Sequence, residues 1–190
     1  MNEHLKPVFE IILPALEQAG VEYSVFGGIG VAGMRQVFYR QNDDVDVCVS
    51  EKNFLAVGKI LSSLARQQNW ELKKDLRLVP GRPKYELSFI GEKHNFFSVI
   101  PLFETPDGIE FKFYKNSLVF ENDIWNRERQ VIGNFSFYRF KNKYVKELCL
   151  AHVKHLGKRA FEPEYRKYLN DLEGISSKEE LTKILANSSL

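Results

Sequence analysis

Residues 23–49, YSVFGGIGVAGMRQVFYRQNDDVDVCV, decide the fold of this chain. The aromatic and apolar run at residues 23–26 predicts a buried β-strand, which Gly27 and Gly28 bring to an end. Glycine permits backbone conformations and close approaches that a Cβ atom forbids. A helix is predicted from about residue 29 to residue 38, so its free N–H groups would point back at the glycine turn. The stretch therefore predicts a cradle for a phosphate.

The second half of the stretch alternates Val45, Val47 and Val49 with Asp44, Asp46 and Cys48. A strand with this period places the valines on one face and both aspartates on the other. Two carboxylates roughly 6.5–7 Å apart along a strand can hold a divalent cation, and Mg²⁺ prefers oxygen ligands with substrate phosphates. The pattern therefore indicates phosphoryl or nucleotidyl transfer. The alternative is that both aspartates are solvated charges on an amphipathic strand.

Together with the glycine pair, residues 40–46 resemble the signature of the polymerase-β-like nucleotidyltransferase superfamily. The resemblance is closest to the lincosamide and aminoglycoside nucleotidyltransferase branch, where G-G is followed by R-x-(H)-x-D-I-D. Arg40, Asp44 and Asp46 fall in register, and Asn42 stands where that branch often has histidine. The resemblance covers about residues 20–50. It implies an α/β (α+β) fold, in which helices flank a nucleotidyltransferase-like mixed β-sheet and a C-terminal helical segment follows.

The resemblance also implies the chemistry of the site. Asp44 and Asp46 would be the catalytic residues and would ligate Mg²⁺ or Mn²⁺. Gly27 and Gly28 would cradle the triphosphate of an NTP, expected to be ATP, and Arg40 would orient it. The second substrate would be a small hydroxylated acceptor.

One position departs from the family pattern. A later strand, often h-D-h-H-P, supplies a third acid there as a metal ligand or as the base for the acceptor hydroxyl. The matching stretch here is residues 97–101, FSVIP, with Ser98 in place of the aspartate and Ile100 in place of the histidine. A hydroxyl does not replace an anion beside a dication pair. Either Glu86 on the neighbouring strand or Glu104 beyond the proline supplies the charge, or the protein binds nucleotide and transfers it poorly.

Three functions therefore stay open at this point. The first is transfer of a nucleoside monophosphate from Mg–NTP to a hydroxyl of a small molecule. The second, favoured by Ser98, is a degenerate protein of the same fold that binds nucleotide or a protein partner with little catalysis. The third is an interaction module in which the glycine pair and the D-x-D motif are coincidental. Binding of Mg–NTP separates the third from the others, and pyrophosphate release separates the first from the second.

Composition narrows the class of protein further. The chain has 190 residues, 44% of them hydrophobic and 13% aromatic, which fits one domain or a domain with a small helical appendage. A net charge of +2 is too small for a nucleic-acid footprint, so no nucleic-acid partner is expected. No long apolar run and no signal-peptide core occur, so a cytoplasmic protein without a membrane partner is expected. Cys48 and Cys149 are predicted to be free thiols.

The remaining elements follow from periodicity and from turn and capping residues. A first helix is expected at residues 5–18 with a kink at Pro14, and a helix capped by Ser50 is expected to reach about residue 65. Strands joined by turns at residues 80–83, 91–94 and 106–108 are expected between residues 70 and 114, and a hairpin at residues 130–140. Helices are expected at residues 142–156 with Asn142 as cap, from Pro163 toward residue 172, and after Ser177 with Glu180 as its capping partner. A boundary is predicted between an α/β domain, residues 1–141, and a C-terminal helical region, residues 142–190.

Several C-terminal residues are further candidates for the site. His152 and His155 have a helical spacing, but no third metal ligand accompanies them. Lys154, Arg166 and Lys167 would reach a triphosphate or lie on a solvated helix face. Residues 164–172 are similar to the family's late R/K-x-K-D-x-x-D-L stretch, with Tyr168 where an acid is expected. For Arg40 the alternative role is a structural salt bridge to Asp43 or Asp44.

Overall fold

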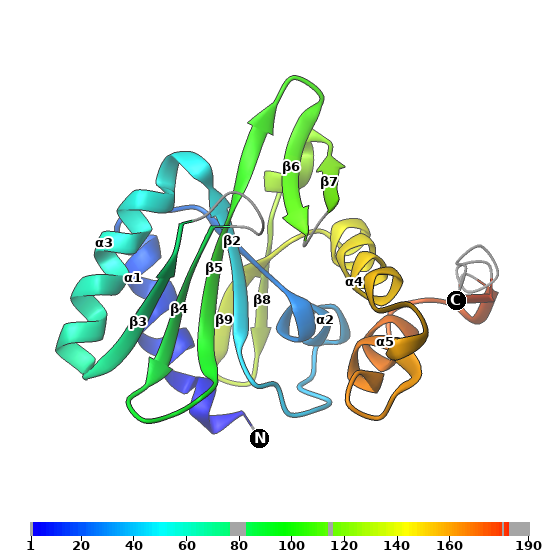
Figure 1. Ribbon diagram of the computed structural model, residues 1–190, viewed down its shortest axis with the longest axis horizontal. Coiled ribbons are helices and arrows are strands. Elements are labelled where there is room, and N and C mark those ends of the chain that lie inside the picture. The colour runs from blue at the N-terminus through cyan, green and yellow to red at the C-terminus, as the bar shows by residue number, and fades with distance from the viewer. Residues whose placement is uncertain (1, 77–82, 114–115, 180, 183–190) are drawn as a thin grey trace.

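A mixed β-sheet forms the centre of the protein (Figure 1). The computed structural model describes residues 2–76, 83–113, 116–179 and 181–182. Within them the strand order is β3-β4-β5-β2-β1-β9-β8, and β6 and β7 extend the sheet from β5. The strands are β1 (Tyr23–Phe26), β2 (Val45–Ser50), β3 (Trp70–Asp75), β4 (Lys84–Phe89), β5 (Asn95–Thr105), β6 (Gly108–Phe113), β7 (Asn116–Phe120), β8 (Glu128–Ile132) and β9 (Phe135–Arg139). β2 runs antiparallel to β1 and parallel to β5, which confirms the expected mixed sheet.

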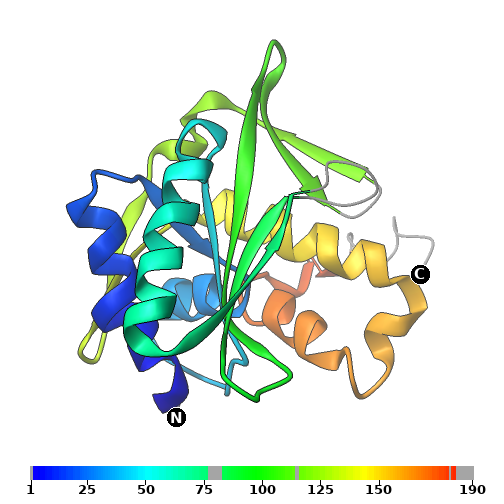
Figure 2. The same cartoon turned by 60° about the vertical axis from the view of Figure 1, so that its left-hand side comes forward.

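The helices lie on both faces of this sheet (Figures 1 and 2). They are α1 (Leu13–Gln18), α2 (Gly27–Arg35), α3 (Glu51–Gln68), α4 (Asn142–Leu156) and α5 (Arg166–Glu173). Short segments are η1 (Glu3–Leu5), η3 (Asn122–Trp125) and η4 (Gly157–Phe161), which are 3₁₀-helical, and η2 (Val8–Ile12), which is π-helical. The mixed sheet with flanking helices is the fold class that the sequence predicts.

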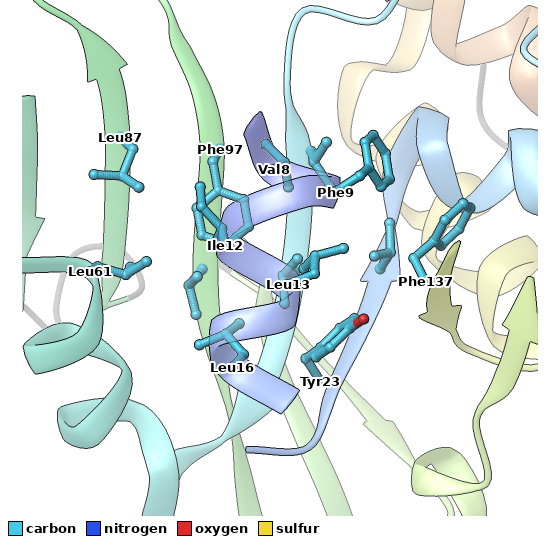
Figure 3. Packing of buried hydrophobic residues seen from close by; sticks show 14 of the residues in the cluster. Val8, Phe9, Ile12, Leu13, Leu16, Tyr23, Leu61, Leu87, Phe97 and Phe137 are labelled. Carbon is cyan, nitrogen blue, oxygen red and sulfur yellow. The ribbon is translucent and has the colours of Figure 1, made fainter. Parts of the chain in front are cut away.

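The first face of the sheet packs against η2, α1 and α3. All three valines of the D-x-D strand are fully buried there, together with Leu13 and Leu61 from the helices. Figure 3 shows this layer, in which Ile12, Leu13 and Leu16 project toward strand residues such as Phe97. Because the valines take this face, the side chains between them must point to the opposite one.

The second face carries a separate apolar cluster under α2 and α4. Phe26 and Cys48 from the strands meet Val31 of α2 and Val145 of α4 in this cluster. Cys48 is buried and Cys149 is half-buried, and neither is in a disulfide, as predicted. The cluster stops short of Asp46, two residues before Cys48 on the same face of β2. A polar pocket therefore begins where this apolar packing ends.

The first helix avoids a break at Pro14 by changing its hydrogen bonding. Pro14 has no N–H to donate, and the turn before it is π-helical: the N–H of Leu13 bonds to the carbonyl of Val8. The predicted helix is thus present, with a π-helical turn at the expected irregularity. The α3 prediction is also confirmed, because the Ser50 side chain accepts a hydrogen bond from the N–H of Lys52.

Several predicted helix limits are wrong. α2 begins at Gly27 and ends at Arg35, so the glycine pair forms its first turn, and Gln36 ends it in a left-handed conformation at φ 58°. α4 has the predicted limits, residues 142–156, but its N-cap is Lys141 and not Asn142. Pro163 lies in a turn closed by the Glu162 carbonyl, so α5 starts only at Arg166.

Other predictions fall partly outside the described residues. Residues 80–82 of the predicted turn at residues 80–83 and the capping partner Glu180 lie there. The hairpin around Gly133 is confirmed as β8 and β9. The domain boundary at residue 141 stays a prediction. Among the described helices, none is long and apolar enough to cross a membrane.

Candidate active site

A pocket of about 220 Å³ lies where the first turn of α2 meets the sheet and the C-terminal helices. All five residues singled out from the sequence line it: Gly27, Gly28, Arg40, Asp44 and Asp46. The first turn of α2 supplies the glycines, the loop before β2 supplies Arg40 and Asp44, and β2 itself supplies Asp46. The structure therefore brings the start of α2 and the start of β2 together in one pocket.

The glycine turn, residues 27 and 28, is packed against Asp46 of β2. Gly27 has a φ of +64°, and a Cβ built on it would lie 3.0 Å from Oδ2 of Asp46. A Cβ on Gly28 would overlap Oδ1 of Asn42 and the guanidinium of Arg40. Both positions therefore require glycine for close approach, and Gly27 also requires it for its backbone conformation.

The two aspartates come from adjacent positions of one local structure. Asp46 lies on β2, and Asp44 immediately precedes the strand, where its Oδ2 accepts a hydrogen bond of 3.2 Å from Nδ2 of Asn95. Burial, followed by the charge of Asp46, raises the pKa of Asp44 to about 8. The pair is thus an arrangement in which one carboxylate resists ionisation. A bound cation would remove that resistance.

Ser98 stands beside Asp46. The two residues are register partners in the parallel β2–β5 pair, and the Ser98 hydroxyl donates a hydrogen bond to Oδ1 of Asp46. The position that the family pattern gives to a third acid is therefore next to the pair, as the resemblance implies, but a neutral donor occupies it. Within the described residues, no three His, Cys, Asp or Glu side chains are grouped so that they could hold a metal ion.

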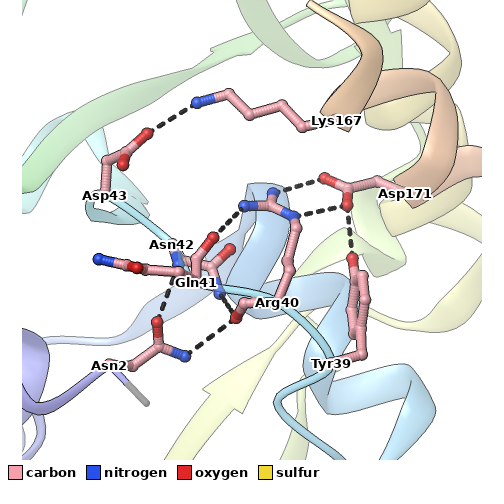
Figure 4. A network of polar contacts seen from close by, with 8 residues as sticks. All are labelled: Asn2, Tyr39, Arg40, Gln41, Asn42, Asp43, Lys167 and Asp171. Carbon is pink, nitrogen blue, oxygen red and sulfur yellow. Dashed lines mark hydrogen bonds and ion pairs between the residues drawn. The ribbon is translucent and has the colours of Figure 1, made fainter.

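Arg40 makes a salt bridge that the sequence analysis missed. Its Nε and Nη2 donate to the two carboxylate oxygens of Asp171 at 2.8 and 2.7 Å, and Tyr39 donates to the same carboxylate at 2.5 Å (Figure 4). Neither Asp43 nor Asp44, the partners considered for the alternative role of Arg40, takes this place. The available signal was the late D-L pair of the family pattern, which Asp171 and Leu172 match.

Lys167 links the same helix to the loop before β2. Its Nζ lies 2.7 Å from Oδ2 of Asp43 (Figure 4), and this ion pair lowers the pKa of Asp43. Of the three C-terminal cations considered from the sequence, Lys167 lines the pocket, whereas Lys154 and Arg166 are not among its lining residues. α5 therefore contacts the loop before β2 at two points: Asp171 pairs with Arg40, and Lys167 pairs with Asp43.

An aromatic wall completes the pocket. His152 of α4 stacks on Tyr168 of α5, with ring centroids 3.9 Å apart and an interplanar angle of 20°. Both rings line the pocket. His155 is exposed and is not a lining residue. The histidine pair considered from its spacing therefore divides into one wall residue and one surface residue.

Of the two replacement acids, only Glu86 lies in the pocket. It is the register partner of Ser98 on β4, and Lys84, two residues before it, pairs with it at 2.6 Å. Glu104 is in the part of β5 that pairs with β6, where its half-exposed carboxylate bonds to Lys52 at 2.6 Å. Glu104 is therefore outside the candidate site.

Solved structures resemble this chain across most of its length. The antibiotic-resistance factor ANT(2'')-Ia matches with a TM-score of 0.64 and 11% identity, covering 98% of this chain and 91% of that one. The lincosamide antibiotic adenylyltransferase LnuA, solved with lincomycin bound, gives 0.57 and 16%, covering 87% and 94%. A putative nucleotidyltransferase from Thermotoga maritima gives 0.52 and 17%, covering 89% and 94%. No protein-family model and no curated protein matches the sequence. These likenesses show that the chain has the nucleotidyltransferase fold.

Proposed function

We propose that the protein is a metal-dependent nucleotidyltransferase that moves a nucleoside monophosphate from an NTP, expected to be ATP, to a hydroxyl of a small molecule. The observation that carries the proposal is the placement of Asp44 and Asp46 in one pocket with the glycine turn at the start of α2. The shared fold supports it, since the similar structures include an adenylyltransferase. Neither nucleic acid nor a membrane is proposed as a partner, and the expected location is the cytoplasm.

The residues present fit a divalent cation. Two half-buried carboxylates offer hard oxygen donors, and the pKa of Asp44 is raised first by burial and then by the charge of Asp46, which a cation would balance. Asp44 and Asp46 would hold Mg²⁺ or Mn²⁺ together with oxygens of the substrate phosphates. When bound, the cation would neutralise charge that develops on the α-phosphate and the leaving pyrophosphate.

The chain's own groups would bind and orient the triphosphate. Gly27 and Gly28 lack side chains at the start of α2, so the free N–H groups of that helix can approach an anion closely. Arg40 lies beside them, and its bonds to Asp171 and to the carbonyl of Gln41 fix its plane. This fixed guanidinium would orient the triphosphate without first losing side-chain freedom.

A second candidate function rests on Ser98. A protein of this fold that binds nucleotide but transfers it poorly would lack an acid next to the aspartate pair, and Ser98 is neutral. The two candidates share nucleotide binding and differ in turnover.

Thermal unfolding with and without Mg–ATP tests the shared part. A ligand that binds only the folded protein stabilises it by about 2.7 kcal/mol at a hundred times its Kd. We expect wild type to gain a metal-dependent rise in Tm, and Asp44→Asn with Asp46→Asn to lose it. Asp43→Asn is the matched control, because Asp43 is an exposed neighbour paired with Lys167. If the double variant keeps the Mg–ATP-dependent rise in Tm, the site assignment is refuted. If the variant loses the rise, an assay of pyrophosphate release by wild type separates a transferase from a protein that only binds nucleotide.

A further inference from the structure

Three side chains lie in line across three neighbouring strands. Asp46 of β2 is the register partner of Ser98 of β5, and Ser98 is the register partner of Glu86 of β4. Register partners point to the same face of a sheet, and all three residues line the pocket. With strands about 4.8 Å apart, the Cα atoms of Asp46 and Glu86 are about 10 Å apart.

The face that Glu86 occupies is fixed by its neighbours on β4. Tyr85 is buried in the cluster under α3, where its ring stands against Gly58, and Leu87 is fully buried in the same cluster. Alternation along the strand then sends Lys84 and Glu86 to the pocket side. A slip of one residue would bury both charges, so packing holds Glu86 at this place.

The glycine turn marks the opposite end of the same line. β1 lies beyond β2, and it leads directly into Gly27 and α2. The order across the sheet is therefore glycine turn, Asp46, Ser98, Glu86. In phosphoryl transfer the entering and leaving oxygens lie on opposite sides of the phosphorus, roughly in line. With the pyrophosphate end at the glycine turn, the entering hydroxyl must approach from the side of β5 and β4.

The spacing suits a base better than a further metal ligand. An attacking oxygen stands about 3–3.5 Å from the phosphorus, and its base lies about 2.6–3.2 Å beyond that oxygen. An acid two strands away leaves this room, whereas a metal ligand would have to join the aspartate pair. Glu86 instead pairs with Lys84, at a side-chain exposure of 21%, and is not grouped with the aspartates as a metal site in the described residues.

We propose that Glu86 is the general base of the transfer and that the acceptor hydroxyl binds over β4 and β5. This inference rests on the proposed nucleotidyl transfer. The acceptor oxygen forms a bond to the α-phosphorus, the bond from that phosphorus to the bridging oxygen breaks, and pyrophosphate leaves. The hydroxyl proton passes to the Glu86 carboxylate. The acid that the family pattern places at Ser98 is thus moved by one strand, and the longer glutamate side chain offsets part of the shift.

Four forms of the full chain test the proposal: wild type, Glu86→Gln, Glu104→Gln as the matched control, and Glu86→Gln combined with Ser98→Asp. Each is assayed for the Tm rise given by Mg–ATP and for pyrophosphate release with tobramycin, lincomycin or water as acceptor. General-base assistance is worth about 10²–10⁴-fold in rate. We expect Glu86→Gln to lose at least about 100-fold in release while keeping the Tm rise. Glu104→Gln should stay within about twofold of wild type, and Ser98→Asp should restore part of the loss.

The outcomes separate this inference from the proposed function. A wild type without a Mg–ATP response and without pyrophosphate release overturns the function, and the base with it. An active wild type whose Glu86→Gln variant remains as active as Glu104→Gln overturns the base alone. Loss of the Tm rise in Glu86→Gln also overturns it, because the residue would then hold the metal or nucleotide. A wild type that binds Mg–ATP but releases no pyrophosphate even to water counts against a competent base at Glu86.

Discussion

Ser98 on β5 donates its hydroxyl hydrogen bond to the carboxylate of Asp46 on β2, its register partner in a parallel strand pair. The bond connects the position that departs from the family pattern with a position that keeps it. A neutral donor stabilises the ionised form of Asp46. An acid at the same place would repel it. The effect of Ser98 on the ion-free protein is therefore opposite to that expected of an aspartate at this position.

Ser98→Asp should lower the Tm of the protein without Mg²⁺ and enlarge the rise that Mg²⁺ produces. The new carboxylate would crowd Asp44 and Asp46, and a cation would relieve the repulsion. Scanning fluorimetry with a Mg²⁺ titration measures both effects. Ser98→Asn is the control for side-chain size, since it adds no charge. Equal Mg²⁺ responses in Ser98→Asp and wild type would place Ser98 away from the metal.

Stability of the ion-free protein should fall as pH rises from about 4 to about 8. The pKa of Asp44 is raised to about 8 by burial and by Asp46, against about 3.9 in an unfolded chain. Between these values the folded protein holds a proton that the unfolded chain has lost. The free energy of unfolding then falls with pH by at most about 1.4 kcal/mol per pH unit for this group.

The check on this pH dependence is urea unfolding at pH 6 and pH 8, without divalent cations. Asp44→Asn removes the titrating group, so it should flatten the dependence and stabilise the protein at pH 8 by about 1–3 kcal/mol. Asp43→Asn should not flatten it, because the pKa of Asp43 is lowered by Lys167. A variant Asp44→Asn with the wild-type slope would contradict the assignment.

Asp171→Ala should destabilise the protein by about 3–5 kcal/mol, because it leaves the largely buried Arg40 without its carboxylate. The side chains of Arg40 and Asp171 are only 19% and 4% exposed. Chemical denaturation measures the loss. Glu173→Ala is the control on the same helix, since its ion pair with Arg166 is about half exposed, and it should change stability by less than about 1 kcal/mol. Similar losses of stability in both variants would contradict a specific role for the Arg40–Asp171 ion pair and would point to a general effect of removing negative charge from α5.

Gly28→Ala should weaken Mg–ATP binding and cost about 1–3 kcal/mol of stability. Its Cβ would overlap the Arg40 guanidinium and the Asn42 amide, so one of them must move. Gly30→Ala is the matched change two residues further along α2, where the nearest atom to the new Cβ is the Val25 carbonyl oxygen at 3.3 Å. That substitution should cost less stability than Gly28→Ala, because its new contact is tight but does not overlap and alanine favours the helix. The Tm of both variants with and without Mg–ATP decides the prediction.

The part of the site that lies close together in sequence is predictable. Residues 23–49 contain a strand, a glycine turn, a helix and a second strand, and each has a local signal. Alternation of valine and aspartate predicts which face each side chain takes. The structure accordingly places Gly27 and Gly28 in the same pocket as Asp44 and Asp46.

The other part depends on pairings that no local pattern specifies. A choice between Glu86 and Glu104 requires the register of β4 on β5, and that register includes an irregularity between Leu87 and Ser88. The Arg40 partner is 131 residues away in the sequence. Which carboxylate pairs with Arg40 depends on how α5 packs against α2 and the loop before β2. Tertiary packing, and not propensity, makes these decisions.

The Arg40–Asp171 ion pair also has a consequence for the order in which the molecule is completed. The N-terminus of a chain emerges from the ribosome first, and every strand described in the sheet precedes residue 140. The sheet and the D-x-D strand can therefore form while Asp171 is still being synthesised. Arg40 stays without its carboxylate until α5 emerges and docks. During synthesis the protein is thus expected to pass through a stage in which the sheet has formed but the loop before β2 is not yet held, and the docking of α5 ends that stage.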